Sequence, residues 1–146
     1  MDEELRKILY KKMLDFIKED ASKKKCCKAN GNSGEVEVYI TRDFLNAVNR
    51  CKVTVVFFYS PTCPYCRAYA PTFATIADEY GDKAAFVRVN VSRNPDIAAY
   101  YNVMGVPTTM IFVEGAPLGV LPGLIDYDTL QRAVEYALQK AGCKFN

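Results

Sequence analysis

Two cysteines separated by two residues, Cys63 and Cys66, are the most chemically informative pair in the sequence. The apolar run Val53–Tyr59 before them predicts a buried strand, and the residues that follow predict a helix. Cys63 is then expected at the helix N-terminus, where the macrodipole and the free N–H groups favour a thiolate over a thiol. Cys66, one turn later, is expected to lie deeper and to close a disulfide with Cys63. The pattern predicts a redox motif.

Composition limits the other possibilities. The chain has 146 residues, half of them hydrophobic, and contains no histidine. The absence of histidine excludes His-assisted hydrolases and histidine-ligated zinc. A net charge of +2 is too small to indicate nucleic acid as a partner. No apolar run approaches the ~20 residues that span a membrane, and the acidic start is the wrong order for a signal peptide. We therefore expect one soluble, cytoplasmic domain.

The sequence divides into an N-terminal extension, residues 1–34, and a domain, residues 35–146. Apolar residues recur at helical spacing over residues 1–20 and predict an amphipathic helix. Residues 21–35 are a basic linker by composition. So broad an apolar stripe is expected to dock on its own domain; docking on a second copy, as a homodimer, is the alternative.

From residue 35 onward, strand and helix patterns alternate. We expect strands at 36–40, 53–59, 84–91, 108–113 and 118–121, and helices at 43–51, 63–80, 95–101 and 126–141. Thr41 is the expected cap of the first of these helices, and Gly115-Ala116-Pro117 the expected hairpin turn. Together they predict an α/β domain of three layers with a mixed sheet. The cysteine pair would lie at the carboxyl end of a central strand, where open α/β sheets place their sites.

Residues 35–146 resemble the thioredoxin superfamily. The resemblance rests on the order and spacing of several motifs. They are the strand and Cys-x-x-Cys at 53–66, Pro71 five residues after Cys66, Val89-Asn90-Val91 with Asn94-Pro95, Gly105-Val106-Pro107-Thr108, and Gly123 before the last helix.

The resemblance implies a binding surface beside the cysteine pair. It implies a cis Val106–Pro107 peptide bond that lies against the two cysteines. Val106 would offer its backbone to an extended substrate segment, and Gly123 would leave room for that segment. Tyr65, and Tyr59 beside it, would add apolar surface.

This chain departs from the family pattern at the active site. Ordinary thioredoxins resemble Trp-Cys-Gly-Pro-Cys, whereas here the residues are Thr62-Cys63-Pro64-Tyr65-Cys66, with a glutaredoxin-type dipeptide. The family's buried carboxylate, which is thought to deprotonate the second cysteine, corresponds to Phe57. Its neighbouring lysine corresponds to Arg88, whose role is then expected to be structural. Pro107 is not followed by the glutathione-holding Gly-Gly-x-Asp pattern of glutaredoxins.

The implied activity is reduction of protein disulfides. Cys63 attacks and Cys66 resolves, while Thr62, Pro64 and Pro71 tune the pair. The expected redox group is the Cys63–Cys66 disulfide, with no other cofactor and no metal. A thioredoxin reductase or another dithiol reductant would supply electrons. The alternatives are a disulfide oxidase or isomerase, and a non-catalytic binding or metal-carrier module.

The other four cysteines are assigned no catalytic role. Cys26 and Cys27 are expected to be exposed free thiols, with a regulatory or intermolecular disulfide as the alternative. Cys51 and Cys143, near helix ends, are expected to be small core or edge residues.

Overall fold

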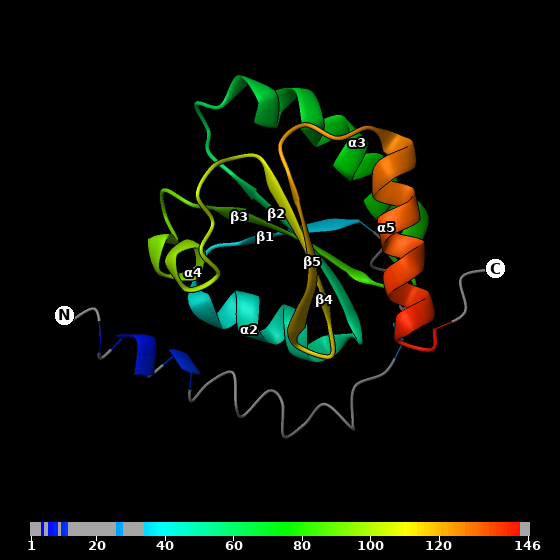
Figure 1. Cartoon of the computed structure of the whole chain (residues 1–146), viewed down its shortest axis with the longest axis horizontal. Helices are drawn as coiled ribbons and strands as arrows, with labels where there is room; N and C mark the ends of the chain where they lie inside the picture. The colour runs from blue at the N-terminus through cyan, green and yellow to red at the C-terminus, as the bar shows by residue number, and fades with distance from the viewer. Residues whose placement is uncertain (1–3, 5, 9, 12–25, 28–33, 144–146) are drawn as a thin grey trace.

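The computed structural model describes residues 4, 6–8, 10–11, 26–27 and 34–143. Strands and helices alternate along the domain as expected (Figure 1). In chain order they are β1 Glu35–Val38, α2 Thr41–Arg50, β2 Val53–Tyr59, α3 Pro64–Tyr80, β3 Ala85–Asn90, α4 Pro95–Tyr100, β4 Thr108–Val113, β5 Ala116–Pro122 and α5 Tyr127–Lys140.

The sheet is mixed, with the strand order β1-β3-β2-β4-β5. β3 pairs in parallel with β1 and with β2, whereas β4 pairs antiparallel with β2 and β5. β2 is therefore central, and its carboxyl end leads into α3 (Figure 1).

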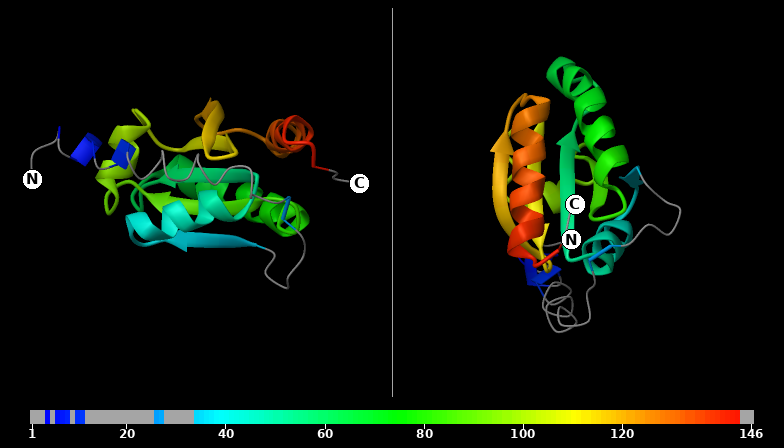
Figure 2. Two further views of the ribbon diagram at one scale, coloured as in Figure 1. Left: turned by 90° about the horizontal axis from the view of Figure 1, so that it is seen from below. Right: turned by 90° about the vertical axis from the view of Figure 1, so that its right-hand side faces the viewer.

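Helices cover both faces of the sheet, which gives the three layers (Figure 2). Because side chains alternate along a strand, β2 contributes to two cores. Val55 and Phe57 join the core under α3 and α5, and Val56 and Phe58 join the core on the side of α2 and α4. β2 is thus fixed by packing on two sides, and the turn that carries the cysteines starts from a rigid strand.

Two local expectations were wrong. α2 begins at Thr41 rather than being capped by it; the Asp43 carboxylate accepts hydrogen bonds from the N–H groups of Tyr39, at 3.0 Å, and Ile40, at 3.2 Å. The hairpin turn is Glu114-Gly115, whose φ values of 53° and 82° are both positive. A two-residue turn of this hand matches the strand twist, so the strand resumes already at Ala116.

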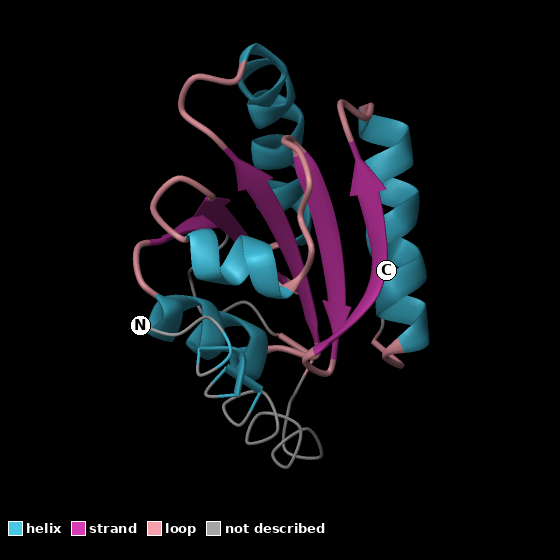
Figure 3. Cartoon of the chain, turned by 60° about the vertical axis from the view of Figure 1, so that its left-hand side comes forward, coloured by secondary structure: helices cyan, strands magenta, loops and turns pink. Residues whose placement is uncertain are grey.

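The described residues between 4 and 11 in the N-terminal extension are helical and dock on the domain (Figure 3). Tyr10 is buried and packs on Tyr100, with ring centroids 4.5 Å apart. Arg6 forms an ion pair with Asp96 at the start of α4. Docking on the chain's own domain is therefore confirmed for these residues. The rest of the predicted 1–20 helix and most of the linker lie outside the described residues. Among the helices described, none is long and apolar enough to cross a membrane.

Candidate active site

Cys63 and Cys66 lie at the junction between β2 and α3. The strand ends at Tyr59, and the turn is closed by the Cys63 N–H, which donates to the Ser60 carbonyl at 3.2 Å. Cys63 is the N-cap of α3, and Pro64 occupies the first turn, where no intrahelical N–H is needed. Both thiols are free; Cys63 is partly exposed and Cys66 is buried. The predicted placement is confirmed.

The Cys63 sulfur has a hydrogen-bond partner on each side. The Cys66 N–H donates to Cys63 Sγ at 3.1 Å, and the Cys63 thiol donates to the Val106 carbonyl at 3.7 Å. The Val106–Pro107 peptide bond is cis, as expected, and this loop lies against the cysteines. The Cys66 N–H lies in the first turn of the helix, where it has no intrahelical acceptor. It is therefore free to donate to a negatively charged sulfur at Cys63.

Cys66 lies over an apolar floor. Its side chain is 3% exposed and belongs to the core that includes Phe57. Burial raises the pKa of the Cys66 thiol to about 11, and its interaction with Cys63 contributes to that rise. Phe57 fills the place of the family's carboxylate with a ring that meets the Tyr69 ring edge-on, at 4.9 Å between centroids. Cys66 is therefore held as a thiol.

A polar pair that the sequence did not suggest lies in the same core. Thr109 Oγ1 donates a hydrogen bond to the Tyr69 hydroxyl at 2.7 Å, and both residues are fully buried. Thr109 is paired with Phe57 across β4 and β2. The hydrogen bond joins α3 to β4 beside the cysteines. No signal in the sequence pairs these two residues, which are forty positions apart.

Tyr65 and Tyr59 differ in their surroundings. Tyr65, between the cysteines, is 65% exposed and presents apolar surface as expected. Tyr59 does not, because the Arg88 guanidinium lies 4.6 Å from its ring centroid and its hydroxyl donates to Glu37 at 2.7 Å. Arg88 also pairs with Glu35 at 3.2 Å. Arg88 thus ties β1 to β3, which is a structural role.

A groove of about 460 Å³ lies between the 101–108 loop and the end of β5. Its lining includes Val106, Pro107 and Val120, and none of its lining residues carries a charge. Gly123 closes one end, where its N–H donates to the Pro107 carbonyl at 2.8 Å. A Cβ at Gly123 would meet no atom within 4 Å, so the expected room is present. Glycine is required there for another reason, its φ of +80°.

The thioredoxin family model matches residues 35–136 of this chain. The chain belongs to the thioredoxin family. Thioredoxin from Griffithsia pacifica is 38% identical over 89 residues, which are 58% of this chain and 82% of that protein. Thioredoxin 1 from Synechococcus elongatus is 35% identical over 81 residues, 56% of this chain and 76% of that protein.

Solved structures of thioredoxins share the fold. A mutant thioredoxin from Halobacterium salinarum, with a single Asn-to-Gln substitution, superposes with a TM-score of 0.68 at 27% identity, covering 72% of this chain and 91% of that chain. Malassezia sympodialis thioredoxin gives a TM-score of 0.65 at 28% identity, covering 71% and 91%. Like the family to which it belongs, this chain is a thiol–disulfide oxidoreductase that reduces protein disulfides.

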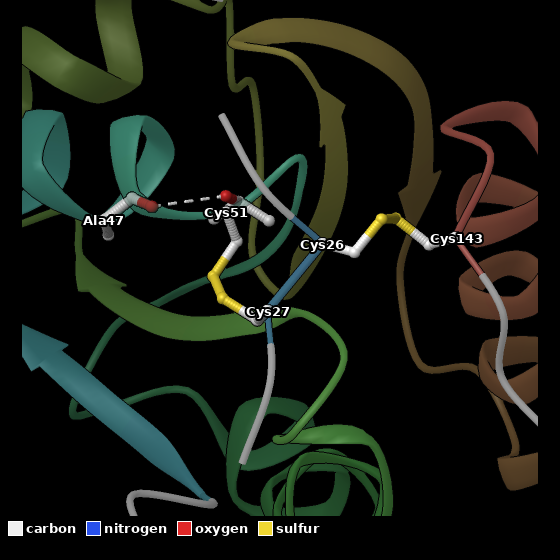
Figure 4. Close-up of a disulfide and its surroundings, with 6 residues drawn as sticks. Cys26, Cys27, Ala47, Cys51 and Cys143 are labelled. Atoms are coloured by element: carbon white, nitrogen blue, oxygen red, sulfur yellow. Dashed lines mark hydrogen bonds between the residues drawn. A yellow bond between two sulfur atoms is a disulfide. The ribbon is translucent and has the colours of Figure 1, made fainter. Parts of the chain in front are cut away.

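The four cysteines outside the family motif form two disulfides (Figure 4). Cys26 is bonded to Cys143, and Cys27 to Cys51. The expectation of free thiols at Cys26 and Cys27 was therefore wrong. Cys51 and Cys143 are buried as expected, but each is half of a disulfide. We call these four cysteines the clasp.

The clasp was missed because it depends on tertiary structure. Cys51 is the C-cap of α2, and Cys143 follows the end of α5, so two helix ends meet the adjacent pair Cys26-Cys27. The available signal was the even number of cysteines left outside the motif. The expectation of a reducing cytoplasm outweighed it. Within the part of the chain that the structure describes, no group of three or more Cys, Asp or Glu side chains is arranged to hold a metal.

Proposed function

We propose that Cys63 and Cys66 carry the reductase activity, with Cys63 as the nucleophile and Cys66 as the resolving thiol. The supporting observation is the asymmetry of the pair. Cys63 is partly exposed at a helix N-terminus and accepts the Cys66 N–H, whereas Cys66 is buried with a raised pKa of about 11. Only Cys63 combines access with a backbone N–H aimed at its sulfur.

The reaction consists of two exchanges. The Cys63 thiolate attacks one sulfur of a substrate disulfide; a mixed disulfide forms, and the other substrate sulfur leaves as a thiolate. Cys66 then loses its proton and attacks Cys63 Sγ, so that the Cys63–Cys66 disulfide forms and the second substrate thiolate leaves. Two electrons have passed to the substrate. A dithiol reductant, such as a thioredoxin reductase, returns them.

The substrate segment is proposed to lie extended along Val106. The Val106 carbonyl already faces Cys63 Sγ, so a chain that pairs with this backbone brings its disulfide to the sulfur. The uncharged groove next to Val106 and Pro107 suits apolar residues flanking that disulfide. Tyr65, exposed between the two cysteines, extends the same apolar surface.

The pair is the proposed redox group, and no further cofactor is invoked. Because the dipeptide Pro64-Tyr65 is of the glutaredoxin type on a thioredoxin body, we expect a reduction potential between about −270 mV and about −200 mV. A potential near the upper limit would favour the oxidase or isomerase alternative. A metal-carrier role would instead require Cys63 and Cys66 to bind zinc with further ligands.

A cytoplasmic location stays a prediction, and the clasp bears on it. Disulfides persist in oxidising compartments and in the cytosol of hyperthermophiles, but are rare in an ordinary reducing cytosol. The two disulfides therefore favour one of the first two settings.

Reduction of insulin by dithiothreitol tests the proposed function. We expect Cys63→Ser to lower turnover to the uncatalysed rate and Cys66→Ser to accumulate mixed disulfides that mass spectrometry detects. The control is Cys27→Ser with Cys51→Ser, which removes two cysteines outside the motif and leaves the site intact. Full activity of Cys63→Ser would disprove the assignment.

A further inference from the structure

We propose that Tyr10, in the N-terminal extension, is a positioning residue for the substrate groove. The proposal rests on the proposed function, because the groove matters only if substrate binds beside Cys63. The family model begins at residue 35, so this residue lies outside the shared domain. Tyr10 is not among the residues that line the groove, and it would act through Tyr101.

Tyr101 joins the extension to the groove. It is one of the residues that line the groove, and its ring meets the Tyr10 ring edge-on, with centroids 6.3 Å apart. On its other sides it packs on Phe112, at 5.0 Å, and Phe44, at 5.7 Å. Tyr100, at 4.5 Å from Tyr10 and 4.8 Å from Tyr101, completes the cluster. Tyr10 thus closes an aromatic cluster that fixes one groove wall.

Tyr101 also sets the path of the loop that reaches Cys63. It is the C-cap of α4, and Asn102 after it adopts a left-handed φ of 57°. The Val103 N–H then donates back to the Ala98 carbonyl at 2.8 Å, which ends the helix and directs the chain toward Val106. If Tyr101 loses its support from Tyr10, this helix end loosens and the Val106 backbone is less well placed.

The extension is attached firmly enough to do this. Tyr10 is 6% exposed. Arg6, one turn before Tyr10 on the same helical segment, forms an ion pair with Asp96 of α4. The contact is therefore a packed one.

The clasp contributes little to this docking. With the disulfides formed, the first covalent link between Tyr10 and the folded domain is at Cys26, 16 residues further along the chain. With the disulfides open, that link is at Glu35, 25 residues further along. Loop closure depends weakly on length, so docking weakens only about twofold. An assay that contains dithiothreitol is therefore valid even if it opens the clasp.

The test compares Tyr10→Ala, Tyr10→Phe and Tyr136→Ala in the full chain. We expect Tyr10→Ala to raise KM for insulin about three- to tenfold, the size of the lost aromatic contacts, with kcat unchanged. Reaction of Cys63 with a small aromatic disulfide, which needs no groove, should keep its rate. Tyr10→Phe should behave as wild type, because the Tyr10 hydroxyl has no hydrogen-bond partner among the described residues. Tyr136, an exposed tyrosine on α5, is the matched control.

A second measurement, amide hydrogen exchange in Tyr10→Leu, keeps the proposal testable if Tyr10→Ala folds poorly. In Tyr10→Leu, amide exchange at Val103 should accelerate, while exchange at Cys143 stays slow. Both N–H groups end helices with 2.8 Å hydrogen bonds, but only Val103 lies next to the cluster. An unchanged KM in Tyr10→Ala, an equal rise in Tyr136→Ala, or equal acceleration at both amides would overturn the proposal. Failure of the wild-type protein to reduce insulin would instead disprove the proposed function, on which the role of Tyr10 rests.

Discussion

The active-site cysteines and the clasp place the same side chain at opposite ends of helices. Cys63 caps the N-terminus of α3, whereas Cys51 is the C-cap of α2 and Cys143 follows the C-terminus of α5. The N-terminal end of a helix carries partial positive charge and the C-terminal end partial negative charge. The two sites therefore expose their sulfur atoms to helix-end fields of opposite sign.

This difference suits each site to its task. Exchange needs a thiolate that can attack and a thiolate that can leave. Cys63, the proposed nucleophile, is partly exposed, whereas opening the clasp by attack on Cys26 or Cys27 would expel a buried thiolate at the C-terminal, negative end of a helix. One protein can thus cycle one disulfide and retain two others. Helix direction and burial, rather than cysteine content, separate reactive from structural sulfur.

The largest expected contrast is in rates of reduction. In excess dithiothreitol, we expect the oxidised Cys63–Cys66 pair to be reduced at least about a hundredfold faster than either clasp disulfide, because exchange follows access and leaving-group stability. Rapid quenching with an alkylating reagent, followed by mass spectrometry of the peptides, measures all three bonds in one sample.

Guanidinium chloride provides the control for that experiment. In the unfolded chain, burial and helix ends are lost, and the three disulfides should be reduced at similar rates. If the native clasp were reduced as fast as the active pair, the comparison between helix ends would be wrong.

The second contrast is in stability. The Cys26–Cys143 bond spans 117 residues and the Cys27–Cys51 bond spans 24. Loops of these lengths predict about 3 to 5 kcal/mol of stabilisation for each bond. Replacing Cys26 and Cys143 by serine should lower the free energy of unfolding by roughly that amount. Denaturant unfolding without reductant measures it.

The active pair is the matched comparison, since its ring is short. Cys63→Ser with Cys66→Ser should change the free energy of unfolding by less than about 1 kcal/mol relative to wild type in which only the Cys63–Cys66 pair is reduced and the clasp is intact, because no crosslink is then removed. An equal loss in both double variants would show that the clasp does not act as a long-range crosslink.

The sequence predicted the placement of the candidate active site because its geometry is local. Spacing alone places Cys63 and Cys66 on one helical turn, and the apolar run before them predicts β2. The mixed, layered sheet follows from the alternation of strands and helices. The position of the Gly-Val-Pro-Thr segment next to the cysteines could be predicted only from the resemblance to the family fold.

The clasp and the Thr109–Tyr69 hydrogen bond are not local. Each joins residues that only the complete fold brings together, at separations from 24 to 117 residues along the chain. The observed start of α2 also differs from the predicted one. The Asp43 side chain, inside the helix, accepts a hydrogen bond from the backbone N–H of Tyr39, before the helix. When tertiary structure determines which residues pair, the only trace of the pairing in the sequence is the number of residues of the types involved.

The last contrast lies within the candidate active site, between Cys63 and Cys66. A mixed disulfide of Cys63 with 5-thio-2-nitrobenzoate reports the resolving step, because attack by Cys66 releases the coloured thiol. Burial, the main cause of the raised pKa of Cys66, persists in this intermediate. Below a pKa of about 11, the thiolate fraction rises about tenfold per pH unit, and we expect release to accelerate in that way from about pH 7 to about pH 10.

Phe57 provides the variant that sharpens this expectation. Phe57→Asp places a carboxylate in the core to which Cys66 belongs. If this carboxylate accepts the Cys66 proton, release near pH 7 should become faster and its pH dependence flatter. Phe57→Leu keeps the floor apolar and should retain the steep profile, which separates the carboxylate from the loss of the ring. Since burying a charge destabilises the core, both variants are compared at equal folded fraction, measured by circular dichroism. A wild-type profile that is already level by about pH 8 would mean that another group takes the Cys66 proton and that the apolar floor does not control resolution.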